Sequence, residues 1–174
     1  MLDGQTSWRD MTVKSLQCGR AQHDTVHFDD LGFCLSNFGH RDAPRVDGID
    51  IYHDKTHCFG FQIIYDEDRP GPLNISKEAK KPNNELQISY LRLQKGEYFT
   101  DIRCRTDNRV CYNIILETNQ GRIAQGGGIG GHMQESEIPQ TMDKRYAVIA
   151  MGGGFGQKMH CLHAHYIDLT KLTS

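Results

Sequence analysis

With 174 residues, 37% of them hydrophobic and 24% charged, the chain is long enough for one domain with a sizeable core and does not resemble a disordered tail. Its formal net charge of −2 excludes nucleic acid as a main partner, because phosphate binding requires a concentrated basic face. The chain shows no signal peptide and no apolar run of membrane-spanning length, so we expect a cytoplasmic protein without membrane insertion.

Residues 1–27 are polar, show no clear period, and are interpreted as an N-terminal extension that packs on the domain or on a partner protein. Alternation of apolar and polar residues then predicts strands at 49–51, 59–65, 86–90, 98–104, 110–116 and 162–166. Turn residues separate these runs at 69–72, 81–84, 95–96, 106–108 and 119–121. The helical signal is a single turn at 76–81, which Pro82 closes. Short strands at near-regular spacing predict an all-β sandwich, barrel or prism.

Two glycine runs, at 126–131 and 152–154, raise the question of a phosphate-binding loop. Gly126, Gly128 and Gly131 satisfy the pattern G-x-G-x-x-G. That pattern binds a dinucleotide only between a strand and a helix, and Pro139 and a polar segment follow here. Neither run contains G-K-[ST], so we interpret the glycines as bends between strands.

A histidine- and cysteine-rich segment follows the second glycine run. If 159–168 is a strand, Cys161, His163 and His165 share one face, and the apolar residues between them take the core. The Cys/His face is therefore predicted to point outward. Two histidines at i and i+2 could chelate zinc, but the usual spacing of four tetrahedral ligands is absent. We expect no cofactor, and Cys161, His163 and His165 are the candidate ligands if a metal is bound.

Nucleophilic catalysis is not indicated by the sequence. No pattern pairs one cysteine or serine with a positioned base, and no two carboxylates are paired, so we do not expect an enzyme. The six cysteines are expected to be free thiols, as in cytosolic proteins.

The segments 45–66, 93–122 and 148–166 resemble the jacalin-related lectins. The middle segment carries most of the resemblance, with Gly96-Glu97-Tyr98 and the strand end Glu117-Thr118-Asn119-x-Gly121. These stretches are similar to the L-x-x-G-E-x-I and T-N-x-G motifs of that family. The resemblance covers residues 28–168 and implies a β-prism of three four-stranded antiparallel sheets, flanked by the extension 1–27 and a C-terminal tail, 169–174.

The resemblance also implies a sugar site. In sugar-binding members the ligand lies between an N-terminal glycine-rich turn and a loop of the form G-x-x-x-D. That loop aligns here with Gly156, Gln157, Lys158, Met159 and His160. A carboxylate accepts hydrogen bonds from two hydroxyls at once, whereas neutral imidazole offers one acceptor and one donor. The loop is therefore expected to be degenerate at its last position.

Two functions remain open from the sequence. The resemblance implies a non-enzymatic, carbohydrate-binding module with a glycan as ligand. The degenerate loop favours instead a structural subunit of an intracellular protein assembly, associated with a complex or the cytoskeleton, that uses the fold for protein contacts without binding sugar. In that case we expect the extension 1–27 and the Cys161/His163/His165 face to contact other proteins.

Overall fold

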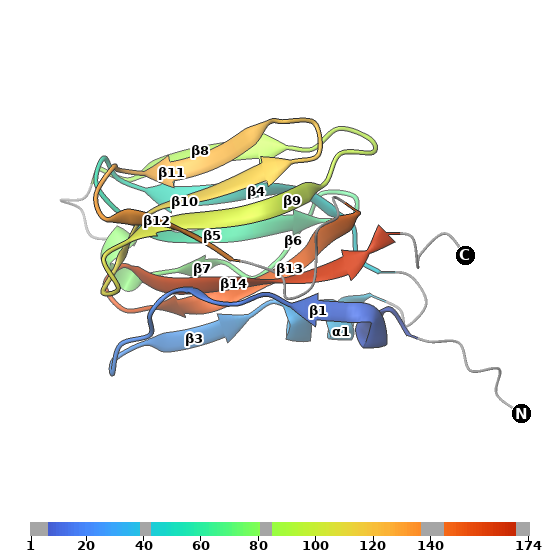
Figure 1. The fold of residues 1–174 in the computed structure, drawn as a ribbon, viewed down its shortest axis with the longest axis horizontal. Coiled ribbons are helices and arrows are strands. Elements are labelled where there is room, and N and C mark those ends of the chain that lie inside the picture. Colours follow the sequence, from blue (N-terminus) through green and yellow to red (C-terminus); the bar gives the residue numbers. More distant parts are fainter. Residues whose placement is uncertain (1–6, 39–42, 81–84, 137–144, 170–174) are drawn as a thin grey trace, which may run out of the picture.

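The computed structural model describes residues 7–38, 43–80, 85–136 and 145–169, which are mostly β-strand (Figure 1). In chain order the elements are η1 (Trp8–Met11), β1 (Thr12–Lys14), β2 (Cys18–Gly19), β3 (Val26–Asp29), α1 (Leu31–Asn37), β4 (Val46–His53), β5 (Cys58–Tyr65), β6 (Arg69–Pro70), β7 (Asn74–Ile75), η2 (Lys77–Lys80), β8 (Gln87–Arg92), β9 (Phe99–Thr106), β10 (Cys111–Thr118), β11 (Ile123–Gly127), β12 (His132–Glu135), β13 (Tyr146–Phe155) and β14 (Met159–Asp168). Within these residues, no helix has the length and apolar character needed to cross a membrane.

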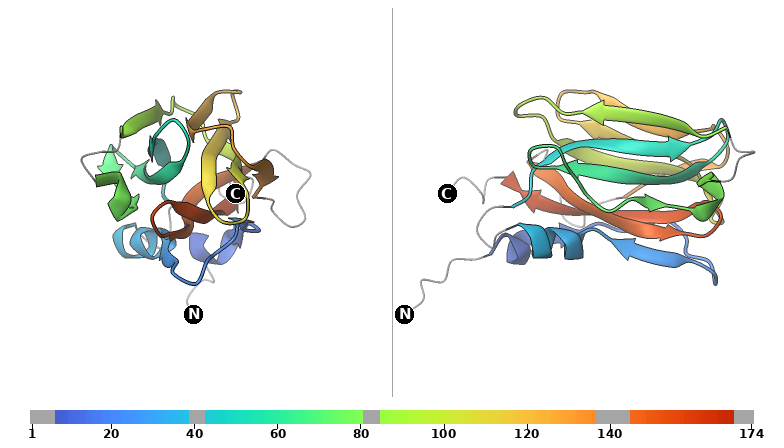
Figure 2. Two further views of the ribbon diagram at one scale, coloured as in Figure 1. Left: turned by 90° about the vertical axis from the view of Figure 1, so that its left-hand side faces the viewer. Right: turned by 180° about the vertical axis from the view of Figure 1, so that it is seen from behind.

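The strands form three antiparallel sheets with one common plan (Figures 1 and 2). Each sheet has a long central hairpin, formed by β4–β5, β9–β10 or β13–β14, with further strands on both sides. In the β4–β5 sheet, β8 pairs with β4 while β6 and β7 pair with β5. In the β9–β10 sheet, β12 pairs with β9 and β11 with β10. This threefold arrangement confirms the predicted β-prism.

The third sheet is completed by the N-terminal part of the chain. In the other two sheets the flanking strands follow their hairpin in sequence, but β13–β14 stands near the end of the chain. Its flanks are β3, which pairs with β13, and β1 and β2, which pair with β14. The stretch interpreted as an extension therefore contributes strands to a sheet. Contact of residues 1–27 with a partner stays a prediction, and residues 1–6 and 170–174 lie outside the described residues.

The core lies between the three sheets and follows from the alternation in the sequence. The six strands predicted from that alternation are confirmed as β4, β5, β8, β9, β10 and β14. In five of these strands the inward side chains are buried, whereas β8 has no buried side chain. The largest buried side chains of the five strands are Phe59, Phe61, Tyr65, Phe99, Ile49, Ile51, Ile63, Ile102, Ile114, Leu116 and Tyr166. Each such side chain stabilises the fold by about 1.5–3 kcal/mol. As predicted, no disulfide joins the six cysteines, all of which are buried.

The helical content differs from the prediction. The single turn expected at 76–81 is present as η2, while Pro82 lies outside the described residues. The helix α1, however, was not predicted. It has seven residues and buries only Cys34, so its sequence offers too few turns for a helical period to be recognised.

Asp30, directly before α1, joins the β13–β14 sheet to the β4–β5 sheet. Its backbone N–H donates to Met151 O at 3.0 Å. Its buried carboxylate accepts hydrogen bonds from Tyr65 Oη at 3.0 Å and from Asn74 Nδ2 at 2.8 Å. Burial raises the pKa of Asp30 to about 6, although both hydrogen bonds act in the opposite direction.

This raised pKa predicts that the contribution of Asp30 to stability is lost as the pH rises from about 4 to about 6. In that window the folded state holds a proton on Asp30 that the unfolded state has released, so the free energy of unfolding falls with pH. Asp30→Asn retains a carbonyl for Asn74 and an N–H₂ for Tyr65, and it is expected to flatten this part of the Tm–pH profile. Thermal unfolding across the window measures the slope. The exposed acid Glu85 provides the control, Glu85→Gln, and an equal slope in wild type and Asp30→Asn would contradict the prediction.

Candidate functional site

The turns of the three central hairpins lie together at one end of the prism, on the left in Figure 1 and toward the viewer in the left panel of Figure 2. They comprise residues 54–57, 107–110 and 156–158, and the connection between β2 and β3 reaches the same end. Gln22 of that connection donates from Nε2 to Asn108 O at 2.8 Å. Burial lowers the pKa of His57, and the positive charge of Lys158 in the third turn lowers it further.

Two of the three turns are closed by an aspartate. Asp54 Oδ1 accepts the backbone N–H groups of Thr56 and His57, both at 2.7 Å. Asp107 Oδ1 accepts those of Arg109 at 2.9 Å and Val110 at 3.1 Å. Although burial alone would raise the pKa of each carboxyl, these hydrogen bonds lower the pKa of Asp54 and of Asp107. Both carboxylates are thus engaged within their own turns.

The third turn begins with glycine instead of aspartate. Gly156 N–H donates to Lys158 O at 3.0 Å, and no side chain from the first position covers the turn. A Cβ on Gly156 would lie 2.8 Å from Cε1 and 3.1 Å from Nε2 of His160, and 3.2 Å from Oδ2 of Asp24. The imidazole of His160 and the carboxylate of Asp24 therefore lie directly against Gly156 and leave no room for a Cβ.

His160 is held in one orientation by the β2–β3 connection. Its Nδ1 lies 2.7 Å from Oγ1 of Thr25, and that oxygen already accepts the Gln22 N–H at 2.7 Å. The Thr25 hydroxyl can donate its proton to Nδ1, and in that arrangement the imidazole proton lies on Nε2. Burial lowers the pKa of His160, with a partial offset from the charge of Asp24, so the ring is neutral at neutral pH. His160 is 5% exposed, so the group that this site presents to solvent is the Asp24 carboxylate.

The predicted loop is divided between a turn and a strand. Gly156, Gln157 and Lys158 form the turn, and Gln157 O accepts a hydrogen bond from the buried Ser76 hydroxyl. Met159 begins β14 and is fully buried, so its side chain does not reach a ligand at the turn. Asp24, which sequence reasoning did not identify, comes from a turn at the opposite end of the sequence.

The interpretation of the glycine runs as bends is wrong for most of their residues. Gly126 and Gly127 lie within β11, and Gly152, Gly153 and Gly154 lie within β13. They are glycines because neighbouring atoms leave no space. A Cβ on Gly153 would lie 2.3 Å from the Cys161 carbonyl oxygen, and one on Gly152 would lie 2.5 Å from the His163 ring.

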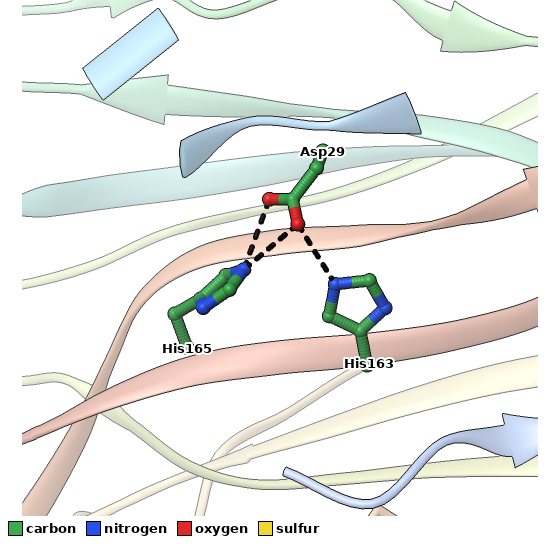
Figure 3. A group of neighbouring side chains, drawn as sticks. All are labelled: Asp29, His163 and His165. Atoms are coloured by element: carbon green, nitrogen blue, oxygen red, sulfur yellow. Dashed lines mark hydrogen bonds and ion pairs between the residues drawn. The ribbon is translucent and has the colours of Figure 1, made fainter. Parts of the chain in front are cut away.

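The prediction that the Cys161/His163/His165 face points outward is also wrong. His163 and His165 are 6% and 4% exposed, and Cys161 is fully buried, so this face is not available for protein contacts. Both histidines meet Asp29 of β3 (Figure 3). Among the described residues, Asp29, His163 and His165 form a group able to hold a metal ion, and Cys161 does not belong to it.

Hydrogen bonds determine the charge of this group. His165 Nε2 lies 2.9 Å from Oδ1 and 3.0 Å from Oδ2 of Asp29, and His163 Nε2 lies 3.1 Å from Oδ2. Burial alone would raise the pKa of Asp29, but the hydrogen bonds from His163 and His165 hold it well below its usual range. The carboxylate is therefore ionised at any working pH.

Solved structures of lectins share this fold. A mannose-binding lectin from Champedak superposes with a TM-score of 0.63 at 19% identity, covering 90% of this chain and 96% of the lectin. Single-chain recombinant jacalin gives 0.64 at 17% identity, with 90% and 94% covered. A mannose-specific jacalin-related lectin from Morus nigra, solved with mannose, gives 0.62 at 16% identity, with 96% and 99% covered. No family model and no curated protein matches the sequence. These likenesses show that the chain has the jacalin-like fold.

Proposed function

We propose that the protein is a non-enzymatic carbohydrate-binding module whose sugar site is the third turn, at residues 156–158. The observation that carries the proposal is the meeting of the exposed Asp24 carboxylate, the imidazole of His160 and Gly156 at this turn. The fold supports it, because structures that share this fold include mannose-binding lectins.

The Asp24 carboxylate suits a sugar's neighbouring hydroxyls, because it is exposed and can accept two hydroxyl protons. His160 is 5% exposed and lies beside it. The resemblance places an aspartate at position 160, where this chain has histidine. Asp24 supplies a carboxylate to the same turn from the β2–β3 connection, so the acceptor is retained in a different position. Gln157 and Lys158 add donors at the turn.

Removing this carboxylate is expected to weaken glycan binding strongly. A hydrogen bond to a charged group contributes about 1.5–3 kcal/mol, so Asp24→Ala should lower the affinity for the bound sugar by roughly 10- to 150-fold. Gly156→Ala should have a similar effect, because its methyl group would clash with His160 and displace Asp24. A glycan array identifies the sugar, and calorimetry with mannose and galactose measures the affinity.

The matched control is Asp101→Ala, which removes an exposed carboxylate toward the other end of β9 and should bind sugar as the wild type does. Flat calorimetric responses of the wild type at millimolar sugar would reject the proposal. Unchanged affinity of Asp24→Ala would reject Asp24 as a ligand-binding residue.

A second candidate function, a subunit of an intracellular protein assembly, is favoured by one surface. Ile88 and Tyr90 of the edge strand β8 are 53% and 72% exposed, and Ile88 lies opposite Tyr52 of β4. Apolar side chains on an edge strand are a common contact for another protein. Size exclusion and cross-linking of native material test this function: a larger complex that Ile88→Ser/Tyr90→Ser disrupts supports it, and a free monomer rejects it.

A further inference from the structure

We propose that Asp29, His163 and His165 form a three-ligand binding site for a divalent transition-metal ion, with Zn²⁺ the best-suited ion. The site is separate from the sugar turn. Its histidines lie three and five residues beyond His160 along β14, a distance of roughly 10–17 Å at about 3.3 Å per residue.

The geometry of the three side chains carries the proposal. One ligand atom from each residue lies within 4.8 Å of the others, and both imidazole Nε2 atoms point at the Asp29 carboxylate (Figure 3). The N–O separations are 2.9 to 3.1 Å. Tetrahedral zinc, with bonds of about 2.0–2.1 Å, requires about 3.4 Å between neighbouring ligand atoms. A small rotation of Asp29, whose side chain is 39% exposed, opens the group to that spacing.

The fold brings the three ligands together across an intervening strand. Alternation along β14 places His163 and His165 on one face, while Asp29 stands on β3, two strands away. Gly152 of β13 is the register partner of both Asp29 and His163. A Cβ on Gly152 would lie 2.5 Å from Cε1 and from Nε2 of His163. Because Gly152 has no side chain, the His163 ring can lie over β13 and reach Asp29.

The ligand types and their burial indicate the kind of ion. Two imidazole nitrogens and one carboxylate oxygen form the ligand set of zinc sites that keep a fourth position for water, and also of non-haem Fe(II) sites. The imidazoles are buried, and the partly exposed Asp29 marks the side from which an ion enters. Without metal, the same three side chains are joined by hydrogen bonds. Zn²⁺ therefore competes with the Asp29 carboxylate for the Nε2 atoms of His163 and His165.

Metal analysis after equilibrium dialysis tests the site. Protein purified without a histidine tag is stripped with a chelator and dialysed against ZnCl₂. We expect one zinc per wild-type chain. Asp29→Asn, His163→Gln and His165→Gln should each weaken binding by at least about tenfold, a loss typical of disturbed metal sites. His132→Gln, which removes an exposed histidine of β12, should bind zinc as the wild type does.

A second measurement covers the case in which the buried histidine variants do not fold. Co²⁺ added to the wild type should give the intense visible absorption of a four-coordinate site and shift the ring resonances of His163 and His165. Absence of stoichiometric zinc and cobalt binding by the wild type would overturn the proposal. It would also be overturned if folded Asp29→Asn bound zinc as tightly as the wild type. Neither result bears on sugar binding at Gly156.

Discussion

Replacing Trp8 with alanine is expected to lower the free energy of unfolding by about 3–5 kcal/mol. Trp8 lies in η1, ahead of β1, and its side chain is fully buried in the common core. The surrounding strands belong to a closed prism and cannot collapse into the space, so the lost contacts leave a cavity. Urea unfolding monitored by circular dichroism measures the change.

The size of this effect tests the role of the N-terminal residues. Ser15 N–H donates to Ala164 O at 2.8 Å, and Ser136 Oγ donates to Leu16 O at 2.7 Å. Gly19 N–H donates to Gln134 Oε1 at 3.0 Å. The segment therefore connects β14 to β12 and closes the junction between two sheets.

The control for Trp8 is Leu16→Ala, because Leu16 is exposed in the same segment and its loss should change stability by less than about 0.5 kcal/mol. A Trp8→Ala protein as stable as Leu16→Ala would show that residues 7–19 are a peripheral arm, which is what their polar, aperiodic sequence suggests when taken alone.

The sequence predicted strands where apolar and polar residues alternate over several positions, and it missed the ten-residue β13, whose glycines interrupt that pattern. β5, β9 and β10 have eight residues each, so four inward positions repeat and the period is clear. β1 and β2 have three residues and two residues, too few for any period. Both strands pair with β14, whose edge would otherwise carry unpaired backbone N–H and C=O groups. This unpaired edge is apparent only when the sheet is assembled.

The candidate sites depend on contacts between residues that are far apart in the sequence, which local sequence patterns do not predict. The sequence placed His163 and His165 on one face of a strand, and that is correct. It assigned that face to solvent because the alternate residues are apolar, but Asp29, 134 positions earlier than His163, packs against it. Asp24 likewise approaches Gly156 only because β3 pairs with β13. The residues around Asp24 are polar, and nothing in their sequence indicates that this carboxylate lies beside Gly156.

Gly153→Ala is expected to destabilise the protein by about 3 kcal/mol or more, because its methyl group would overlap backbone atoms. The Cβ would lie 2.3 Å from the Cys161 carbonyl oxygen and 3.0 Å from the Leu162 Cα. These atoms belong to the β13–β14 ladder, where Gly153 pairs with Leu162, so they cannot move without loss of hydrogen bonds. Chemical unfolding and amide exchange along β14 measure the damage.

Gly32→Ala is the matched substitution with the opposite sign. Gly32 lies in α1, where an added methyl group would meet no heavy atom within 4 Å, and alanine favours a helix over glycine by about 0.5–1 kcal/mol. The pair separates the two explanations for the glycines of β13. If they were flexible bends, Gly153→Ala would be tolerated as Gly32→Ala is. If close strand contact requires them, as the distances indicate, the two variants should differ by several kcal/mol, and equal stabilities would contradict that explanation.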